Sequence, residues 1–299
     1  MSSPLISIMI ATYNQPEYIV KGLQSCLAQD YDNYEVVIGD DSTNDDNYNA
    51  LSPYLNDPKI KYYRNKENIG RVKNYHKLLY EYATGDWAMM LDGDDYYIDN
   101  NYLSQAAKWI NENENIVMVS AGHLLINEIN NTETFLPLIK ENKVFAGKDL
   151  FYNFIQIGQH STCIYNRTLA KELNFYSFNS MATDADGLFR LCLNGNVVFL
   201  KNIVVIWRIH NNNYTFKASG AIKQMHEMKF IDSIANYSVK FIGLKEAKIW
   251  KNKMYYSMSF HILSLAENTK NKFTILRVTL WASKYWRLID TFRYIKRIF

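Results

Sequence analysis

The sequence predicts an α/β fold in which a mostly parallel sheet is flanked by helices and followed by a C-terminal α-helical appendage. Over the first 100 residues, short apolar runs alternate with stretches of helical periodicity, which favours parallel strands joined by right-handed crossovers. After Lys217, glycine and proline almost vanish, and the pattern becomes helical with breaks near Gly243 and Asn268. We therefore expect an α/β domain over 1–215 and a separable helical region over 216–299.

The elements of the first half follow from apolar patterning. The β-rich run Leu5–Ala11 predicts a strand, and Pro16 then suits the first turn of a helix. The core-facing stripe of that helix is Ile19, Leu23, Cys26 and Leu27. Further strands are expected at Tyr34–Gly39, Ile60–Tyr63 and Trp87–Leu91, with helical stretches between them.

The second half has a less regular pattern. Helices are expected over 100–113, 148–156, 167–173 and 184–193. Strands are expected over 116–126, 162–165, 197–200 and 203–208, with a polar loop at 209–214.

Carboxylates follow two of the expected strands. Asp92, Asp94 and Asp95 follow the fourth strand, and Asp40 and Asp41 follow the second. Ligands bind at the carboxyl edge of such sheets, and carboxylates two residues apart can share a divalent cation with phosphate oxygens and water. The structural alternatives are an Asp-rich turn for the first cluster and capping of the next helix for the second.

The composition argues against several classes of protein. A formal net charge of +3 is too small to indicate nucleic-acid binding. Cys26, Cys163 and Cys192 are widely spaced, so they indicate neither a zinc site nor a disulfide framework and fit a reducing cytosol. We expect no signal peptide, and no uncharged apolar stretch approaches the ~18 residues of a membrane span.

Taken in order, these segments resemble the family 2 glycosyltransferases of the GT-A fold over roughly residues 5–215. The family's opening strand and turn, its second strand with paired acids, and its Asn-x-Gly turn with the following helix are matched by 8–14, 36–42 and 68–74. Its D-x-D motif is matched by Asp92, Gly93 and Asp94.

The downstream Glu-Asp motif of that family and its helix correspond to 183–195, where Thr183 replaces the Glu. Two candidates for the catalytic base therefore remain, Asp184 and Asp186, and helix capping is the structural alternative for Asp184. The family's later Arg-x-His pattern ends here at His210. The Gln-x-x-Arg-Trp motif of processive synthases is missing from the sequence, which favours a single addition.

The resemblance implies a GT-A catalytic domain over 1–215, with a nucleotide-binding half at 1–100 and an acceptor and catalytic half at 101–215. It implies inverting, metal-dependent transfer of one sugar from a nucleoside diphosphate sugar, expected to be a UDP-sugar, to a hydroxyl of a glycan acceptor. Such an enzyme would extend a bacterial surface polysaccharide or glycoconjugate.

The same resemblance assigns roles to residues. Asp94 and Asp92 would hold Mn²⁺ or Mg²⁺, which acts as a Lewis acid on the leaving diphosphate. The donor would be bound by Ala11, Tyr13, Asp40, Asp41, Asn68, Arg71, Asp92, Gly93 and His210. By local sequence alone, Arg71 and His210 are more typical of solvated surface positions.

Two other functions compete with this interpretation. A sugar nucleotidyltransferase would need a Gly-rich, basic loop after the first strand, where this chain has Thr12–Gln15. A non-catalytic module for nucleotide sugars or glycans is the second alternative, and the retained acids argue against it. Product release in the presence of an acceptor distinguishes the enzyme from the binding module.

The C-terminal stretch from Lys272 to Phe299 is basic and aromatic, with Asp290 as its single acid. Its basic residues are Lys272, Arg277, Lys284, Arg287, Arg293, Lys296 and Arg297. Basic and aromatic side chains favour an anionic membrane surface, so we expect a cytoplasmic protein attached peripherally to the inner face of the cell membrane, with a lipid-linked acceptor. The alternative is that the aromatics pack against the catalytic domain or a second subunit, which leaves a homo-oligomer open.

Overall fold

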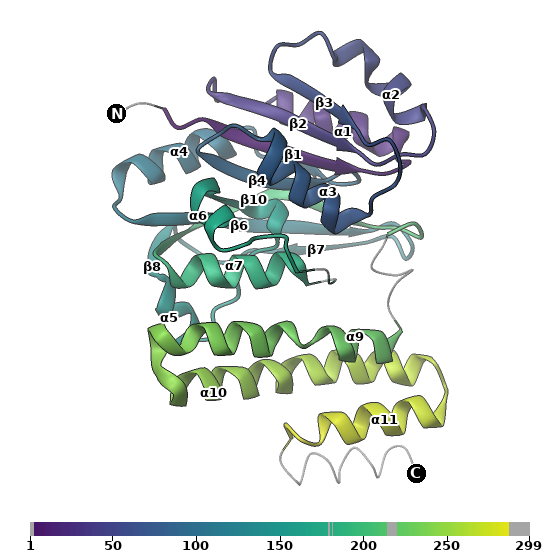
Figure 1. Ribbon diagram of the computed structural model, residues 1–299, viewed down its shortest axis with the longest axis vertical. Helices are drawn as coiled ribbons and strands as arrows, with labels where there is room; N and C mark the ends of the chain where they lie inside the picture. The colour runs from purple at the N-terminus through teal and green to yellow at the C-terminus, as the bar shows by residue number, and fades with distance from the viewer. Residues whose placement is uncertain (1–2, 179, 181, 214–219, 287–299) are drawn as a thin grey trace. The chain divides into compact units, whose positions relative to one another are not determined.

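The computed structural model describes residues 3–178, 180, 182–213 and 220–286 (Figure 1). The chain divides into two compact units, Met1–His210 and Asn211–Phe299. Each unit is described by itself below.

The first unit begins with a parallel half-sheet. Its strands are β1 (Ile6–Thr12), β2 (Tyr34–Asp40), β3 (Ile60–Arg64) and β4 (Trp87–Asp92). β1 pairs in parallel with both β2 and β4, and β2 pairs in parallel with β3. The strands expected from the first 100 residues are therefore confirmed, with ends shifted by at most one residue.

The second half extends the same sheet but is mixed. Its strands are β5 (Tyr96–Tyr97), β6 (Ile116–Asn127), β7 (Thr132–Leu136), β8 (Lys143–Ala146), β9 (Cys163–Asn166) and β10 (Asn196–Ile209). Within the described residues, the sheet runs β3-β2-β1-β4-β9-β6-β10-β5, with β7 beside β6 and β8 beside β10. β6 and β10 are parallel, whereas β9 is antiparallel to both β4 and β6.

Two expectations for the second half differ from the structure. The strands expected at 197–200 and 203–208 are one strand, β10, whose register against β6 shifts between Phe199 and Ile203. β5, β7 and β8 were not predicted, because they are short or solvent-exposed and lack a continuous apolar pattern.

Helical segments cover both faces of the sheet. They are α1 (Pro16–Leu27), α2 (Asp46–Leu51), η1 (Ser52–Tyr54), α3 (Arg71–Lys77), η2 (Leu78–Tyr82), α4 (Tyr102–Glu112), α5 (Gly147–Tyr152), η3 (His160–Thr162), α6 (Arg167–Glu172) and α7 (Thr183–Leu193). α1 and α4 contribute to one hydrophobic core cluster, and α3, α6 and α7 contribute to the other.

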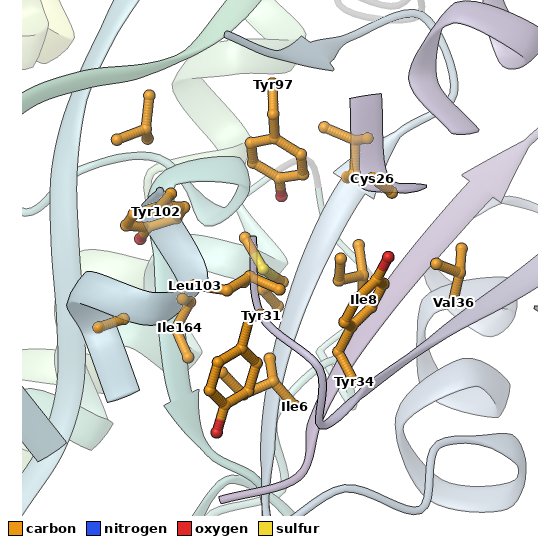
Figure 2. Close-up of a cluster of buried hydrophobic side chains, with 14 of the residues drawn as sticks. Ile6, Ile8, Cys26, Tyr31, Tyr34, Val36, Tyr97, Tyr102, Leu103 and Ile164 are labelled. Carbon is orange, nitrogen blue, oxygen red and sulfur yellow. The ribbon is translucent and has the colours of Figure 1, made fainter. Parts of the chain in front are cut away.

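Alternation along β1 shows how the sheet separates these two cores. Ile8 and Ile10 belong to the cluster that includes Cys26 of α1, whereas Met9 belongs to the cluster that includes Tyr75 of α3. Figure 2 shows the first cluster, with apolar side chains from the strands and helices meeting in one layer. A central strand that is buried on both faces requires a continuous apolar sequence. The end of this apolar run therefore marks the end of the strand.

The second unit is helical. It contains α9 (Ala221–Glu227), α10 (Phe230–Asn268) and α11 (Lys272–Ala282). The backbone of Gly243 is not helical (φ 81°, ψ 161°), so α10 consists of two helices. The breaks expected near Gly243 and Asn268 are thus confirmed. No helix among the described residues is long and apolar enough to cross a membrane.

Candidate active site

The acids lie together because the register of the central strands aligns their carboxyl ends. Ala11 of β1 pairs with Asp92 of β4, and Thr12 pairs with Asp40 of β2. Gly93 lies so close to this edge that an added Cβ would come within 2.8 Å of the Thr12 side chain. Glycine is therefore required between the two acids of the D-x-D motif for the turn to pack against β1.

Asp94 and His210 form a buried pair at this edge. The Nε2 atom of His210 lies 3.0 Å from Oδ2 of Asp94, and both residues are buried. His210 follows the end of β10, so the pair joins two elements 116 residues apart in the chain. His210 is thus a buried partner of the D-x-D motif, which excludes the interpretation as a solvated surface histidine.

Asp95 adds a third carboxyl group at this turn. Its Oδ1 accepts a hydrogen bond from the backbone N–H of Arg208 at 3.0 Å. Burial, together with the charges of Asp94 and Asp92, raises the pKa of Asp95 well above its usual range. A bound cation would relieve this repulsion.

Asp92 belongs to a second pair that the sequence did not predict. Its Oδ1 accepts a hydrogen bond from the Tyr75 hydroxyl, and its Oδ2 lies 3.1 Å from Nε2 of His160. Burial opposes ionisation, but His160, Arg71 and Tyr75 lower the pKa of Asp92 to about 2. Burial also opposes protonation of His160, yet Asp92 raises the pKa of that histidine. Asp92 is therefore a carboxylate with both oxygens engaged.

Arg71 lies at the N-terminus of α3, close to the same acids. Its guanidinium carbon is 5.4 Å from the Tyr75 ring centroid. Burial alone would lower the pKa of Arg71, but Tyr75, Asp92 and Asp184 together raise it. A partly buried arginine among carboxylates can anchor a phosphate, in contrast to the solvated role that its local sequence favours.

The two candidate bases lie in the first turn of α7 and have different surroundings. Asp186 is buried and accepts from Arg190, with Nε 2.8 Å from Oδ2 and Nη2 3.5 Å from Oδ1. Asp184 acts electrostatically on both Arg71 and His160. The N-cap is Ala182, so Asp184 is the second helical residue rather than the cap. The surroundings therefore distinguish Asp186, which is paired with Arg190, from Asp184, which interacts with Arg71 and His160.

Asp40 and Asp41 both hold loops in place. Asp40 accepts from Ser42 N (3.0 Å), Asn47 Nδ2 (3.2 Å) and the Tyr62 hydroxyl (2.6 Å). The two oxygens of Asp41 accept from the backbone N–H groups of Ile69 (2.9 Å) and Gly70 (2.8 Å). Neither acid caps α2, whose N-cap is Asp45.

The remaining predicted donor contacts lie around these loops. Ala11 is nearly buried, whereas the Tyr13 side chain is 46% exposed. Asn68 is exposed, and its Oδ1 accepts from the backbone N–H of Gly70 at 2.9 Å. The exposed Tyr13 leaves an aromatic face available beside the carboxyl end of β1.

The protein side chains alone do not complete a metal site. Among the described residues, no group of three or more His, Cys, Asp or Glu side chains has the arrangement to hold a metal ion. Asp94 and His210 nevertheless provide a carboxylate and an imidazole within 3.0 Å of each other beside two further acids. This pair fits a cation whose other ligands are diphosphate oxygens and water.

Comparison with known proteins identifies the family. The profile described as glycosyl transferase family 2 matches residues 7–173, which is more than half of the chain. This chain belongs to glycosyl transferase family 2. The expectations of a family 2 member, and of a glycosyltransferase rather than a nucleotidyltransferase, are thereby confirmed.

Relatives of this chain include two bacterial proteins that are named as glycosyltransferases. The chain is 36% identical over 102 residues to WcaA of Escherichia coli K12, named for colanic acid biosynthesis, covering 33% of this chain and 36% of WcaA. It is 27% identical over 187 residues to the poly(ribitol-phosphate) β-N-acetylglucosaminyltransferase TarS of Staphylococcus aureus MW2, covering 62% of this chain and 31% of TarS. The matches thus span only about a third of either relative.

Solved structures confirm the fold. TarS 1-349 in complex with UDP-GlcNAc superposes with a TM-score of 0.63 at 22% identity, covering 84% of this chain and 70% of that one. The mannosyltransferase PcManGT of Pyrobaculum calidifontis, in complex with GDP-Man and Mn²⁺, gives a TM-score of 0.61 at 15% identity, covering 99% of this chain and 79% of that one. The expected GT-A fold, with a sheet flanked by helices and C-terminal helices, is confirmed.

Proposed function

We propose that this glycosyltransferase transfers a single sugar, with inversion, from a UDP-sugar to a hydroxyl of a bacterial surface glycan in a reaction that needs a divalent cation. The observation that carries the proposal is the meeting of two carboxylate–histidine pairs, the buried Asp94–His210 and the partly buried Asp92–His160, at one sheet edge with Arg71 and Asp184. Family membership and the UDP-GlcNAc complex of TarS support the donor class.

Asp94 and His210 are the proposed cation ligands. When bound, the cation would stabilise the charge of the leaving diphosphate. An imidazole beside a carboxylate suits Mn²⁺ better than Mg²⁺, because Mg²⁺ takes mainly oxygen ligands. Asp92 is the weaker of the two predicted aspartate ligands, since Tyr75 and His160 already occupy its two oxygens. We assign Asp92 mainly to a contact with the ribose.

The nucleotide would lie along the carboxyl ends of β1 and β2. Tyr13 offers an exposed ring for the base beside Ala11. Asp40 and Asp41 shape the loops around it and stay candidates for base recognition, as does Asn68 at the edge of the 65–70 turn. Gly93 lets the D-x-D turn approach the bound nucleotide, and Arg71 would contact a phosphate with the backbone amides that begin α3.

Asp184 is the proposed general base. In a single displacement, the acceptor hydroxyl attacks the anomeric carbon, its proton passes to the Asp184 carboxylate, and the nucleoside diphosphate leaves with the bonding electron pair. Asp186 is bound to Arg190 in a bidentate ion pair, so it is less suited to receive that proton.

The C-terminal helices supply the proposed membrane contact. Phe273, Leu276 and Leu280 of α11 are 86%, 42% and 61% exposed, and they lie at i, i+3 and i+7 beside the exposed Lys272 and Arg277. Such a stripe fits shallow insertion into an anionic lipid surface at the inner face of the membrane, where a lipid-linked acceptor would be reached.

Other aromatic residues of this region pack within the second unit, an arrangement that neither interpretation of the sequence predicted. Tyr285 stacks on Tyr255 with centroids 4.2 Å apart, and Nε1 of the buried Trp286 donates to the Ser259 hydroxyl at 2.7 Å. The predicted contacts from Arg287, Arg293, Lys296 and Arg297 lie outside the described residues.

The enzymatic proposal is tested by Asp94→Ala. Nucleoside diphosphate release from a panel of UDP- and GDP-sugars should require Mn²⁺ and a glycan acceptor in the wild type and should be lost in the variant. The matched control is Asp86→Ala, which removes an exposed carboxylate just before the other end of β4 and should leave activity unchanged. Full turnover of Asp94→Ala in chelator would refute the metal role, and donor binding without turnover by the wild type would favour the non-catalytic module.

A further inference from the structure

The His210 imidazole has a second neighbour that the proposed chemistry does not use. Tyr18 of α1 stacks on the His210 ring with centroids 4.8 Å apart and an interplanar angle of 17°. The same tyrosine ring receives the Arg208 guanidinium, whose central carbon is 4.9 Å from its centroid. Tyr18 therefore contacts both a cation and the proposed metal-binding imidazole.

Glu128 fixes the far end of this tyrosine. The Tyr18 hydroxyl donates to Glu128 Oε2 at 3.2 Å, and Arg208 Nε lies 3.8 Å from Glu128 Oε1. The backbone N–H of Glu128 donates to the carbonyl oxygen of Ile209 at 2.9 Å, directly before His210. Burial and the Glu128 charge raise the pKa of Tyr18, so the phenol stays protonated and donates at neutral pH.

These contacts restrict the plane of the imidazole. The ring of His210 can rotate about its side-chain torsions, but rotation away from the observed plane would break the stack with Tyr18 and carry Nε2 away from Asp94. Partners that fix the orientation of a metal-binding histidine, most often through its other ring nitrogen, support metal binding, and their loss typically weakens metal affinity or activity about 10–100-fold.

We propose that Tyr18 and Glu128 are positioning residues that set the affinity of the Asp94–His210 pair for a divalent cation without contacting the donor. This inference rests on the proposed function, because it takes His210 as a cation ligand. Tyr18 supplies the stacking face, and Glu128 keeps that face in place through the Tyr18 hydroxyl.

The test is a titration with Mn²⁺, followed by electron paramagnetic resonance, on the full chain in the presence of UDP and, separately, of GDP. Tyr18→Leu removes the ring and should raise the Kd for Mn²⁺ about 10–100-fold, with activity recovering at saturating Mn²⁺. Tyr18→Phe and Glu128→Gln retain the ring and should raise the Kd less. Tyr152→Leu and Glu133→Gln are exposed controls on α5 and β7 that should bind Mn²⁺ as the wild type does.

The variant His210→Ala distinguishes a failure of the proposed metal site from a failure of the positioning role of Tyr18. If His210→Ala binds Mn²⁺ as tightly as the wild type, the proposed metal site is wrong. If His210→Ala loses affinity while Tyr18→Leu, folded by its metal-free melting temperature, keeps the wild-type Kd, the positioning role is refuted. Should Tyr18→Leu unfold, wild-type Kd values for both Tyr18→Phe and Glu128→Gln would refute the role of the Tyr18–Glu128 hydrogen bond.

Discussion

Replacing Asp184 or Asp186 of α7 by asparagine should affect different properties of the enzyme, the catalytic rate in one case and the unfolding free energy in the other. Asp186→Asn breaks a bidentate ion pair with Arg190 in which the aspartate side chain is only 11% exposed. A hydrogen bond to a charged group contributes about 1.5–3 kcal/mol, so this variant should lose that much unfolding free energy and little of its rate.

Asp184→Asn should give the opposite result. A positioned base contributes about 10²–10⁴ in rate, which corresponds to about 2.7–5.4 kcal/mol of activation free energy at 1.36 kcal/mol per tenfold change. The substitution keeps the shape of the side chain and lies in the first turn of α7, where Asp186 keeps its ion pair with Arg190. The unfolding free energy and the donor affinity should therefore stay close to those of the wild type.

Three measurements on the same preparations decide between the two acids. They are the rate of nucleoside diphosphate formation at saturating donor and acceptor, the donor Kd by calorimetry, and urea unfolding. A rate for Asp184→Asn within tenfold of the wild type would refute its role as base. A large loss of rate in Asp186→Asn with wild-type stability would assign the role of general base to Asp186 instead.

Three further predictions concern stability and membrane binding. Burial opposes ionisation of Glu35, but hydrogen bonds lower its pKa, so its contribution to stability is present above the unfolded pKa of about 4.3 and is lost as pH falls through the folded pKa. Urea unfolding between pH 7 and pH 3 should therefore show a smaller decrease of unfolding free energy for Glu35→Gln than for the wild type. His160→Leu leaves Asp92 without one partner and should lower the unfolding free energy by about 1–3 kcal/mol, more than His160→Gln does; calorimetric melting like that of the wild type would contradict this. Phe273→Ser should weaken flotation with anionic vesicles about tenfold or more, whereas the exposed control Phe178→Ser should not; equal flotation of both would remove the proposed lipid contact.

The first half of the fold could be predicted from sequence because its strands are buried on both faces. Such strands need continuous apolar runs, and the acids at their ends then fall on one edge whatever the details of packing. The hairpin strand β7 could not be predicted in the same way, since every residue of Thr132–Leu136 is exposed and no core constrains its pattern.

Site residues within a local sequence motif could be predicted, whereas those brought together only by tertiary contacts could not. Asp94 and its neighbours belong to a local motif, so spacing alone pointed to them. His160 belongs to no local motif, and its partner Asp92 is 68 residues away, so only the antiparallel approach of β9 to β4 brings them together. The burial of His210 and the placement of Arg71 beside Asp92 and Asp184 likewise depend on tertiary contacts that local polarity does not reveal.

The two histidines imply different tasks for the two acids of the D-x-D motif. Asp92 is held on both oxygens by Tyr75 and His160, so a cation that took it as a full ligand would have to displace one of these buried partners. Asp94 lies against His210, and releasing that contact places an oxygen and a nitrogen ligand on the same cation. Because an unpaired buried charge is costly, the less expensive arrangement leaves Asp92 with its partners and puts the cation between Asp94 and His210.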